Sequence, residues 1–296
     1  MKKLFIILTL ICFLAPIAIA KEGSMKLLAI KRTDQGYQGA GADLHLEITQ
    51  GSGRVFIDTF PLTQTDTQIS TRFAKQIACD YLDINCAKFD FFYTIRAQSS
   101  IIAGPSAGAA ITLLTISLLD NQNLDPNVGL TGTINSGGLI GAVGGVQQKI
   151  DAAKSMGLTT VLIPVGERFF KNETNASNTT NSTINVTVDL VEYGAELGIT
   201  VQEVSDIPEA LSAFTGTIHI PENKQLDIDA SYTETMKFLA DSLCNRTRIQ
   251  TAKIVNLSGQ NNDTYKKVIN LTQTADSSYN QTDYYSAASY CFTANV

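Results

Sequence analysis

The 296-residue sequence contains no tryptophan and only two histidines, His45 and His219. The scarcity of histidine excludes metal centres built from several imidazoles, and the absence of tryptophan excludes binding cages lined by indole rings. Neither histidine lies near a recognisable nucleophile turn, which argues against a catalytic triad with an imidazole base. Any catalysis by this chain must therefore run mostly without histidine.

Positive charge is also in short supply. The 22 Lys and Arg residues are outnumbered by 28 Asp and Glu residues, for a net charge of −6. This balance argues against non-specific binding to nucleic acid or to anionic membranes. Hydrophobic residues make up 44% of the chain, which is enough to bury a core and excludes wholesale disorder. We therefore expect a folded protein with no nucleic-acid partner.

The N-terminal segment has the composition of an export signal. Lys2 and Lys3 precede an apolar run over residues 4–20, which ends in the small-residue sequence Ala18-Ile19-Ala20. We predict that residues 1–20 form a cleaved signal peptide. The run is nearly long enough to remain as a membrane anchor, and this alternative stays open. Either form predicts that the rest of the chain is extracellular or on the outer face of the cell membrane, and contact with the membrane is expected only for the anchor.

Four cysteines remain when Cys12, in the leader segment, is set aside. An even number in an oxidising compartment predicts disulfides, and four cysteines allow three pairings. Local spacing favours Cys79 with Cys86 and Cys244 with Cys291. A zinc site is the alternative, but no pair has C-x-x-C spacing, so we predict no metal.

Triplets of the form N-x-S/T, the acceptors of N-linked glycans, are dense in the second half of the chain. Residues 25–171 contain none, which indicates a compact body with a decorated periphery. The polar, low-complexity segment 171–187 is expected to be an exposed loop. The candidate glycosylation sites are Asn172, Asn175, Asn178, Asn181, Asn185, Asn245, Asn256, Asn262, Asn270 and Asn280.

Hydrophobic periodicity predicts an α+β fold. The segments with the apolar pattern of strands are 25–60, 89–97, 128–134, 159–164, 186–191 and 200–204. Helical spacing is found over 67–82, from the Gly-Pro-Ser turn to 119, and over 146–156, 193–197 and 207–214. From about residue 220 glycine becomes rare and helical spacing dominates. We predict one domain of mixed sheets and helices over 24–216, followed by a separate, small helical accessory region over 217–296.

The pentapeptide Gly104-Pro105-Ser106-Ala107-Gly108 is a candidate nucleophile turn. Proline suits the start of a helix, and the glycines allow close approach of backbones. A serine at a helix N-terminus lies among unpaired backbone N–H groups that can hold a developing oxyanion. Gly104, Pro105 and Ala107 would then shape the turn around Ser106. By itself, however, the pentapeptide is more typical of an ordinary helix cap.

Lys149 is the candidate base for this serine. It lies at the start of the helix that follows the glycine-rich segment 137–145. An ordinary lysine has a pKa near 10.4 and is protonated at pH 7, so it cannot accept a proton. In an apolar pocket, with Val143, Val146 and Ile150 close in sequence, its pKa would fall toward neutrality. Taken alone, a lysine on a helix is more often a surface residue.

The two segments together resemble the proteolytic domain of the Lon protease family, most specifically over residues 99–166 and more weakly over 25–214. The motifs that carry the resemblance are Gly104-Pro105-Ser106-Ala107-Gly108, Leu130-Thr131-Gly132-Thr133-Ile134, Val143-Gly144-Gly145-Val146-Gln147-Gln148-Lys149 and Val161-Leu162-Ile163-Pro164. The resemblance implies a Lon-type fold with a serine–lysine dyad, in which Ser106 is the nucleophile, Lys149 is the general base and the hydroxyl of Thr131 holds the lysine. Because Lon protease domains form rings, it also implies a homo-oligomer.

Two positions depart from the Lon pattern. Ala103 and Thr133 stand where the family often has acidic residues. The loss of these carboxylates puts the tuning of the site in doubt but leaves the dyad in place. A pocket without them would be drier and would help to keep Lys149 neutral.

The sequence contains no nucleotide-binding motif of the form G-x-x-x-x-G-K-[ST]. We therefore expect an exported, ATP-independent serine endopeptidase that cleaves unfolded or flexible polypeptides and needs no cofactor, metal or nucleotide. The alternative is a non-catalytic Lon-like binding or assembly module at the cell surface, which the missing acidic residues and the many glycosylation triplets favour. A signal-peptidase-like enzyme with the same dyad is disfavoured by the order of the motifs.

Overall fold

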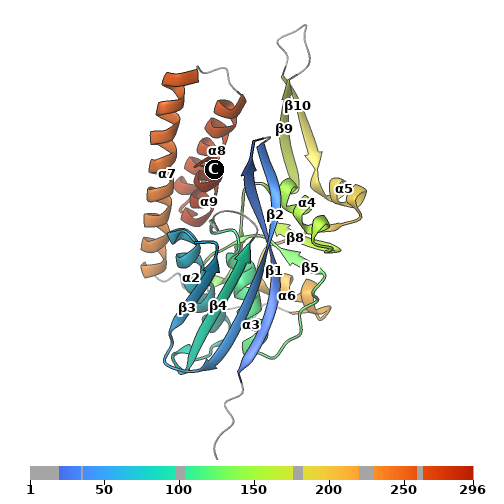
Figure 1. Cartoon of the computed structure of the whole chain (residues 1–296), viewed down its shortest axis with the longest axis vertical. Coiled ribbons are helices and arrows are strands. Elements are labelled where there is room, and N and C mark those ends of the chain that lie inside the picture. Colours follow the sequence, from blue (N-terminus) through green and yellow to red (C-terminus); the bar gives the residue numbers. More distant parts are fainter. Residues whose placement is uncertain are drawn as a thin grey trace, which may run out of the picture.

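The computed structural model describes residues 20–34, 36–97, 104–175, 183–219, 230–258 and 263–295. The segment 1–19, which carries the predicted signal peptide or anchor, lies outside these residues. At the centre is a twisted seven-stranded sheet (Figure 1) with the strand order β11-β8-β5-β1-β2-β4-β3. Both parallel and antiparallel pairs occur in it, so the fold is a mixed α/β arrangement, as predicted.

Two long antiparallel strands, β1 (Lys21–Thr33) and β2 (Gly36–Gln50), form the middle of the sheet. β2 pairs on its other side with β4 (Phe89–Ala97), and β3 (Val55–Phe60) forms the edge. Alternate residues of β2 and β4 are buried, which confirms the period-2 pattern predicted for them; these residues are Ala42, Leu44, Leu46, Ile48, Phe91, Tyr93 and Ile95.

The other half of the sheet consists of short parallel strands. β5 (Val128–Leu130), β8 (Thr160–Pro164) and β11 (Thr200–Val204) run side by side. The run Val161–Ile163 is fully buried, as expected for a strand covered on both faces. After β5 the chain forms a small second ladder, β6 (Thr133–Ile134) with β7 (Ile140–Gly141), which lies beside the glycine-rich segment.

Helices pack against the sheet in two groups that enclose two hydrophobic cores. The larger core includes residues of α2 (Thr65–Leu82), α3 (Gly108–Leu119) and α6 (Ile207–Thr215). The smaller core includes residues of α4 (Val146–Ser155) and α5 (Leu190–Leu197). Nearly every residue of α3 is buried, so this helix passes through the protein interior and carries the predicted nucleophile turn at its N-terminal end.

The predicted exposed loop over 171–187 is wrong for most of its length. The chain there forms a hairpin of β9 (Phe169–Asn175) and β10 (Thr183–Asp189), separate from the large sheet (Figure 1). Residues 176–182 lie outside the described part. The alternation of Ile184, Val186 and Val188 with polar residues favours a strand, and the high polarity of the segment concealed this pattern.

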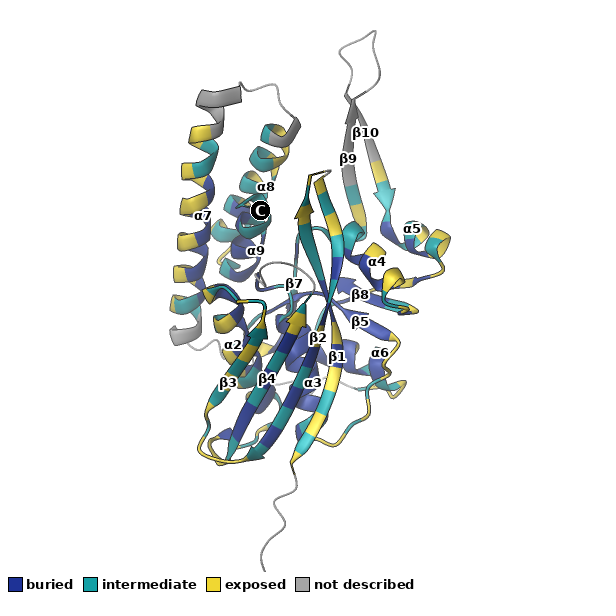
Figure 2. Cartoon of the chain, viewed as in Figure 1, coloured by how far each residue is buried: buried dark blue, intermediate teal, exposed yellow. Residues whose placement is uncertain are grey.

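The C-terminal region is helical, as predicted, and consists of α7 (Ala230–Ser258), α8 (Asp263–Asn280) and α9 (Tyr284–Asn295). Its buried residues form one hydrophobic core with residues of the sheet domain. Its outer face is exposed along α7 (Figure 2). None of the helices in the described residues is both long enough and apolar enough for a transmembrane span.

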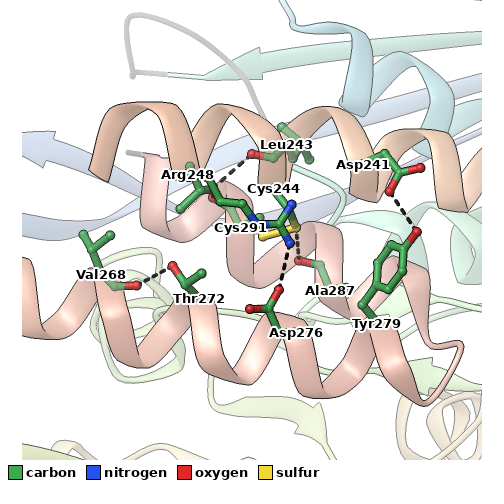
Figure 3. A network of polar contacts seen from close by, with 11 residues as sticks. Asp241, Leu243, Cys244, Arg248, Val268, Thr272, Asp276, Tyr279, Ala287 and Cys291 are labelled. Carbon is green, nitrogen blue, oxygen red and sulfur yellow. Dashed lines mark hydrogen bonds and ion pairs between the residues drawn. A yellow bond between two sulfur atoms is a disulfide. The ribbon is translucent and has the colours of Figure 1, made fainter. Parts of the chain in front are cut away.

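Both disulfides favoured by spacing are present. Cys79 at the end of α2 pairs with Cys86, and Cys244 of α7 pairs with Cys291 of α9. Figure 3 shows the second disulfide among polar contacts that join the three C-terminal helices, including the Arg248–Asp276 ion pair and a hydrogen bond of 2.8 Å from the Tyr279 hydroxyl to Asp241. The helices therefore form one cross-linked unit.

Candidate active site

Ser106 lies in a turn immediately before α3, two residues upstream of the first helical residue. Gly104 begins this turn with a φ of 99°, a conformation that side chains disfavour. The backbone N–H of Gly132 donates to the Ser106 carbonyl at 3.0 Å, and that of Ala109 donates to the Gly132 carbonyl at 3.1 Å. The turn is thereby hydrogen-bonded to the segment between β5 and β6, and Ser106 is half-buried.

Lys149 lies in the first turn of α4 with only 2% of its surface exposed. Its Nζ donates to Thr131 Oγ1 at 3.0 Å, and the Thr131 hydroxyl in turn lies 3.4 Å from the Ser106 carbonyl oxygen. Burial lowers the pKa of Lys149 to about 7, and the nearby Glu167 carboxylate opposes this shift. A large fraction of this amine is therefore neutral at pH 7.

Ser106 and Lys149 line the same small cavity of about 30 Å³. Ala29 and Ile30 of β1, together with Pro105 and Gly144, form further parts of its wall. The structure therefore brings the two predicted dyad residues, which are 43 positions apart in the sequence, to one site, with Thr131 beside the lysine.

The last part of the wall comes from the C-terminal region. Ser289, Phe292 and Thr293 of α9 line the same cavity. The fully buried Tyr285, also on α9, donates a hydrogen bond of 2.6 Å to Ser70 Oγ on α2. No motif in the sequence places this helix at the site.

Residues 95–188 match the family model described as the Lon protease (S16) C-terminal proteolytic domain. This match and the curated relatives described below support a relationship of this chain to the Lon protease family. The match includes the nucleophile turn, Thr131 and Lys149, so the residues brought together in the structure lie inside the Lon-type domain.

Curated Lon proteases from bacteria and archaea are similar over part of this chain. The Lon protease of Mycoplasma mobile is 30% identical over 168 residues, which are 49% of this chain and 20% of that protein. That of Phenylobacterium zucineum is 34% identical over 111 residues, 37% of this chain and 14% of the relative. That of Methanosphaera stadtmanae is 28% identical over 183 residues, 62% and 19% respectively. The chain thus spans at most a fifth of the length of these three Lon proteases.

Two carboxyl groups near the site, of the half-buried Glu167 and the buried Asp66, were not predicted from the sequence. The first is Glu167, just after β8, which accepts a hydrogen bond of 2.8 Å from the hydroxyl of Tyr290 on α9. Burial raises the pKa of Glu167, while the Tyr290 hydrogen bond and the charge of Lys149 lower it. Ala103 and Thr133 suggested a site without acidic groups. The structure instead has the Glu167 carboxyl near Lys149. Ala103 itself lies outside the described residues, and Thr133 is fully buried.

The second missed carboxyl is Asp66, in the first turn of α2 and 3% exposed. Its Oδ2 accepts a hydrogen bond from the backbone N–H of Gly104 at 2.9 Å, and its Oδ1 accepts one from Thr67 at 2.8 Å. Burial raises the pKa of Asp66, and these hydrogen bonds oppose the shift. Asp66 therefore supports the first residue of the nucleophile turn from a helix about 40 positions upstream.

We expect Asp66→Ala to lower the free energy of unfolding by about 2 kcal/mol, because it leaves the buried N–H of Gly104 unpaired. Asp66→Asn keeps an acceptor and should restore most of the loss. Urea unfolding of the two variants beside the wild type measures both effects. Equal stability of Asp66→Ala and the wild type would show that Gly104 does not depend on this carboxyl.

The remaining candidate residues lie away from the dyad. His45 bonds to Ser24 and His219 to Thr215, and neither lines the cavity. Within the described residues no group of three or more His, Cys, Asp or Glu side chains is placed to hold a metal ion.

The candidate glycosylation sites fall in three groups. Asn245, Asn270 and Asn280 are exposed on the C-terminal helices, and Asn256 lies on α7. Three others, Asn172, Asn175 and Asn185, are in the β9–β10 hairpin. The last three, Asn178, Asn181 and Asn262, lie outside the described residues.

Proposed function

We propose that this chain is an exported, ATP-independent serine endopeptidase that cleaves unfolded or flexible polypeptides, with Ser106 as nucleophile and Lys149 as general base. One observation carries the proposal: a fully buried amine with a pKa near neutrality lines the same cavity as the serine at the N-terminal end of α3. The Lon-type match over residues 95–188 supports the same activity.

In the proposed reaction, neutral Lys149 accepts the proton of the Ser106 hydroxyl as its Oγ attacks the peptide carbonyl. The negative charge that develops on the carbonyl oxygen is stabilised by backbone N–H groups of the turn around Ser106 and Ala107, where the N-terminus of α3 contributes a positive dipole. The protonated lysine then donates its proton to the leaving amine. Water, activated by the same lysine, hydrolyses the ester on Ser106.

Thr131 is a positioning residue in this scheme. Its hydroxyl is the hydrogen-bond partner of Lys149 Nζ, and it fixes the amine beside the nucleophile turn. A long flexible lysine has many rotamers, so a fixed partner lowers the entropic cost of each proton transfer.

Further parts of the proposal rest on the sequence. The lysine-led apolar segment at residues 2–20 and the two disulfides support export. The sequence contains no G-x-x-x-x-G-K-[ST] motif, which supports cleavage without nucleotide and hence a preference for polypeptides that are already unfolded. Assembly into a ring is proposed by analogy with the Lon family.

The proposal is tested by following casein cleavage without nucleotide between pH 5 and pH 9. Because the base must be neutral, kcat/KM should fall about tenfold per pH unit below pH 7 and level off above it. Addition of ATP and Mg²⁺ should change the rate less than about twofold. A rate that keeps rising up to an ordinary lysine pKa near 10.4 would contradict the assignment of a buried lysine base.

A further inference from the structure

Helix α9 packs directly on the two backbone segments that form the candidate site. A Cβ atom built on Gly104, in the nucleophile turn, would lie 3.0 Å from the Phe292 ring. One built on Gly144, in the glycine-rich segment, would lie 2.1 Å from Thr293 Oγ1. Gly144 does not have a positive φ, so its own backbone conformation would accept a side chain. With Thr293 in place, a side chain at position 144 has no room.

Polar contacts hold α9 in this position. The Tyr285 hydroxyl donates to Ser70 Oγ at 2.6 Å and lies 3.5 Å from the carbonyl oxygen of Pro105, next to the nucleophile. Five residues further along α9, the hydroxyl of Tyr290 donates to Glu167 Oε1 at 2.8 Å. Contacts to the sheet domain therefore lie one turn before the stretch that faces the cavity and within that stretch.

The remaining space is too small for a substrate. The cavity of about 30 Å³ that Ser106 and Lys149 share has room for one or two water molecules. A peptide must bring its carbonyl carbon to about 3–3.5 Å from the serine Oγ and place the residues on both sides nearby. No such segment fits while Phe292 and Thr293 occupy their positions.

The disulfide couples any movement of α9 to its neighbours. Cys291 of α9 is bonded to Cys244 of α7 (Figure 3). Thr247 Oγ1 of α7 also donates to the Cys291 carbonyl at 3.1 Å. An opening of the site by displacement of α9 would thus involve α7, whose outer face is exposed (Figure 2).

We propose that α9 is a built-in cover of the active site, and that the structure shows the closed state of the protease, in which a segment of its own chain occupies the position of the substrate. This inference rests on the proposed serine endopeptidase function. The chain exchanges between a closed and an open state, and only the open state binds polypeptide. Substitutions that weaken the contacts of α9 with the site raise the open fraction and with it the rate of cleavage.

The test compares Phe292→Ala with Phe238→Ala, each in the full chain. Phe292 contacts the nucleophile turn, whereas Phe238 lies on α7 in the same helical unit with 66% of its surface exposed. We expect Phe292→Ala to raise kcat/KM for casein at least tenfold and Phe238→Ala to change it less than twofold. Thr293→Ala, a smaller change at the neighbouring contact with Gly144, should give an intermediate increase and serves if Phe292→Ala does not fold.

Labelling by a small fluorophosphonate, with Ser106→Ala as the blank, separates the possible failures. If the wild type is labelled and cleaves casein as fast as Phe292→Ala and Thr293→Ala, the cover is wrong and the endopeptidase stands. If the two variants change the preferred cleavage positions without a faster total rate, α9 is a wall of the substrate pocket and the cover is again overturned. If no form is labelled and none cleaves, the proposed function itself fails.

Discussion

Ser106→Ala and Lys149→Met will each lower the kcat/KM for casein by at least about 10³-fold. In the proposed reaction Ser106 forms the covalent bond to the substrate. Without the amine of Lys149, the Ser106 hydroxyl has no proton acceptor. Because the two side chains act in one step, the double variant should be hardly worse than either single one. The rates are best measured in the Phe292→Ala background as well, where the cover, if present, is weakened.

Lys154→Met is the matched control for the lysine. Lys154 lies on the same helix α4 and is exposed, so the substitution removes a lysine without touching the cavity. It should retain full activity, and near-ultraviolet circular dichroism should show all variants folded. Substantial activity in folded Ser106→Ala or Lys149→Met would contradict the assignment of Ser106 and Lys149 as the dyad.

Lys149→Met should also make the protein more stable, by about 4 kcal/mol at pH 6. The pKa of Lys149 falls from 10.5 in the unfolded chain to about 7 in the fold. At pH 6 both states bind the proton, so the full cost of a buried ammonium destabilises the fold, at about 1.4 kcal/mol per pKa unit. Methionine has a similar volume and no charge, and the loss of the hydrogen bond to Thr131 offsets about 1 kcal/mol of the gain.

The stability difference between Lys149→Met and the wild type should depend on pH. Between pH 7 and pH 10.5 the folded chain holds the neutral amine while the unfolded chain still binds a proton, so the wild type gains stability relative to the variant as the pH rises. Urea unfolding at pH 6 and pH 9.5 should therefore show a large difference that shrinks at the higher pH. The exposed Lys154→Met should change little at either pH, and an equal effect of the two substitutions would mean that Lys149 is solvated.

The free-energy cost of burying Lys149 helps to distinguish an enzyme from a non-catalytic Lon-like module. The buried lysine lowers the free energy of unfolding at neutral pH and below. A methionine would fill the same space without this cost, so packing alone does not explain a lysine here. A general base needs this placement, because only burial brings the amine near neutrality. The position of Lys149 therefore favours the endopeptidase over the binding module.

Local patterns were sufficient for much of the fold. The alternation along β2 and β4, the apolar run of β8 and the helical spacing of α2, α4 and α7 reflect the periods of strand and helix, which each segment expresses without the others. Spacing was likewise enough for the two disulfides, because a short separation in sequence favours pairing. The hairpin over 169–189 was missed because its polar composition outweighed a weak alternation.

The sequence by itself determined the residue types and their order: a serine between glycines before an apolar helix, a lysine after a glycine-rich segment, and the resemblance that joins them. Only the tertiary structure decided what surrounds them. Asp66 supports Gly104 across 38 positions, Tyr290 bonds Glu167 across 123 and Tyr285 bonds Ser70 across 215. Contacts over such separations leave no local periodicity, since they depend on which surfaces meet when the helices pack on the sheet. For that physical reason, the presence of α9 over the serine became visible only in the folded chain.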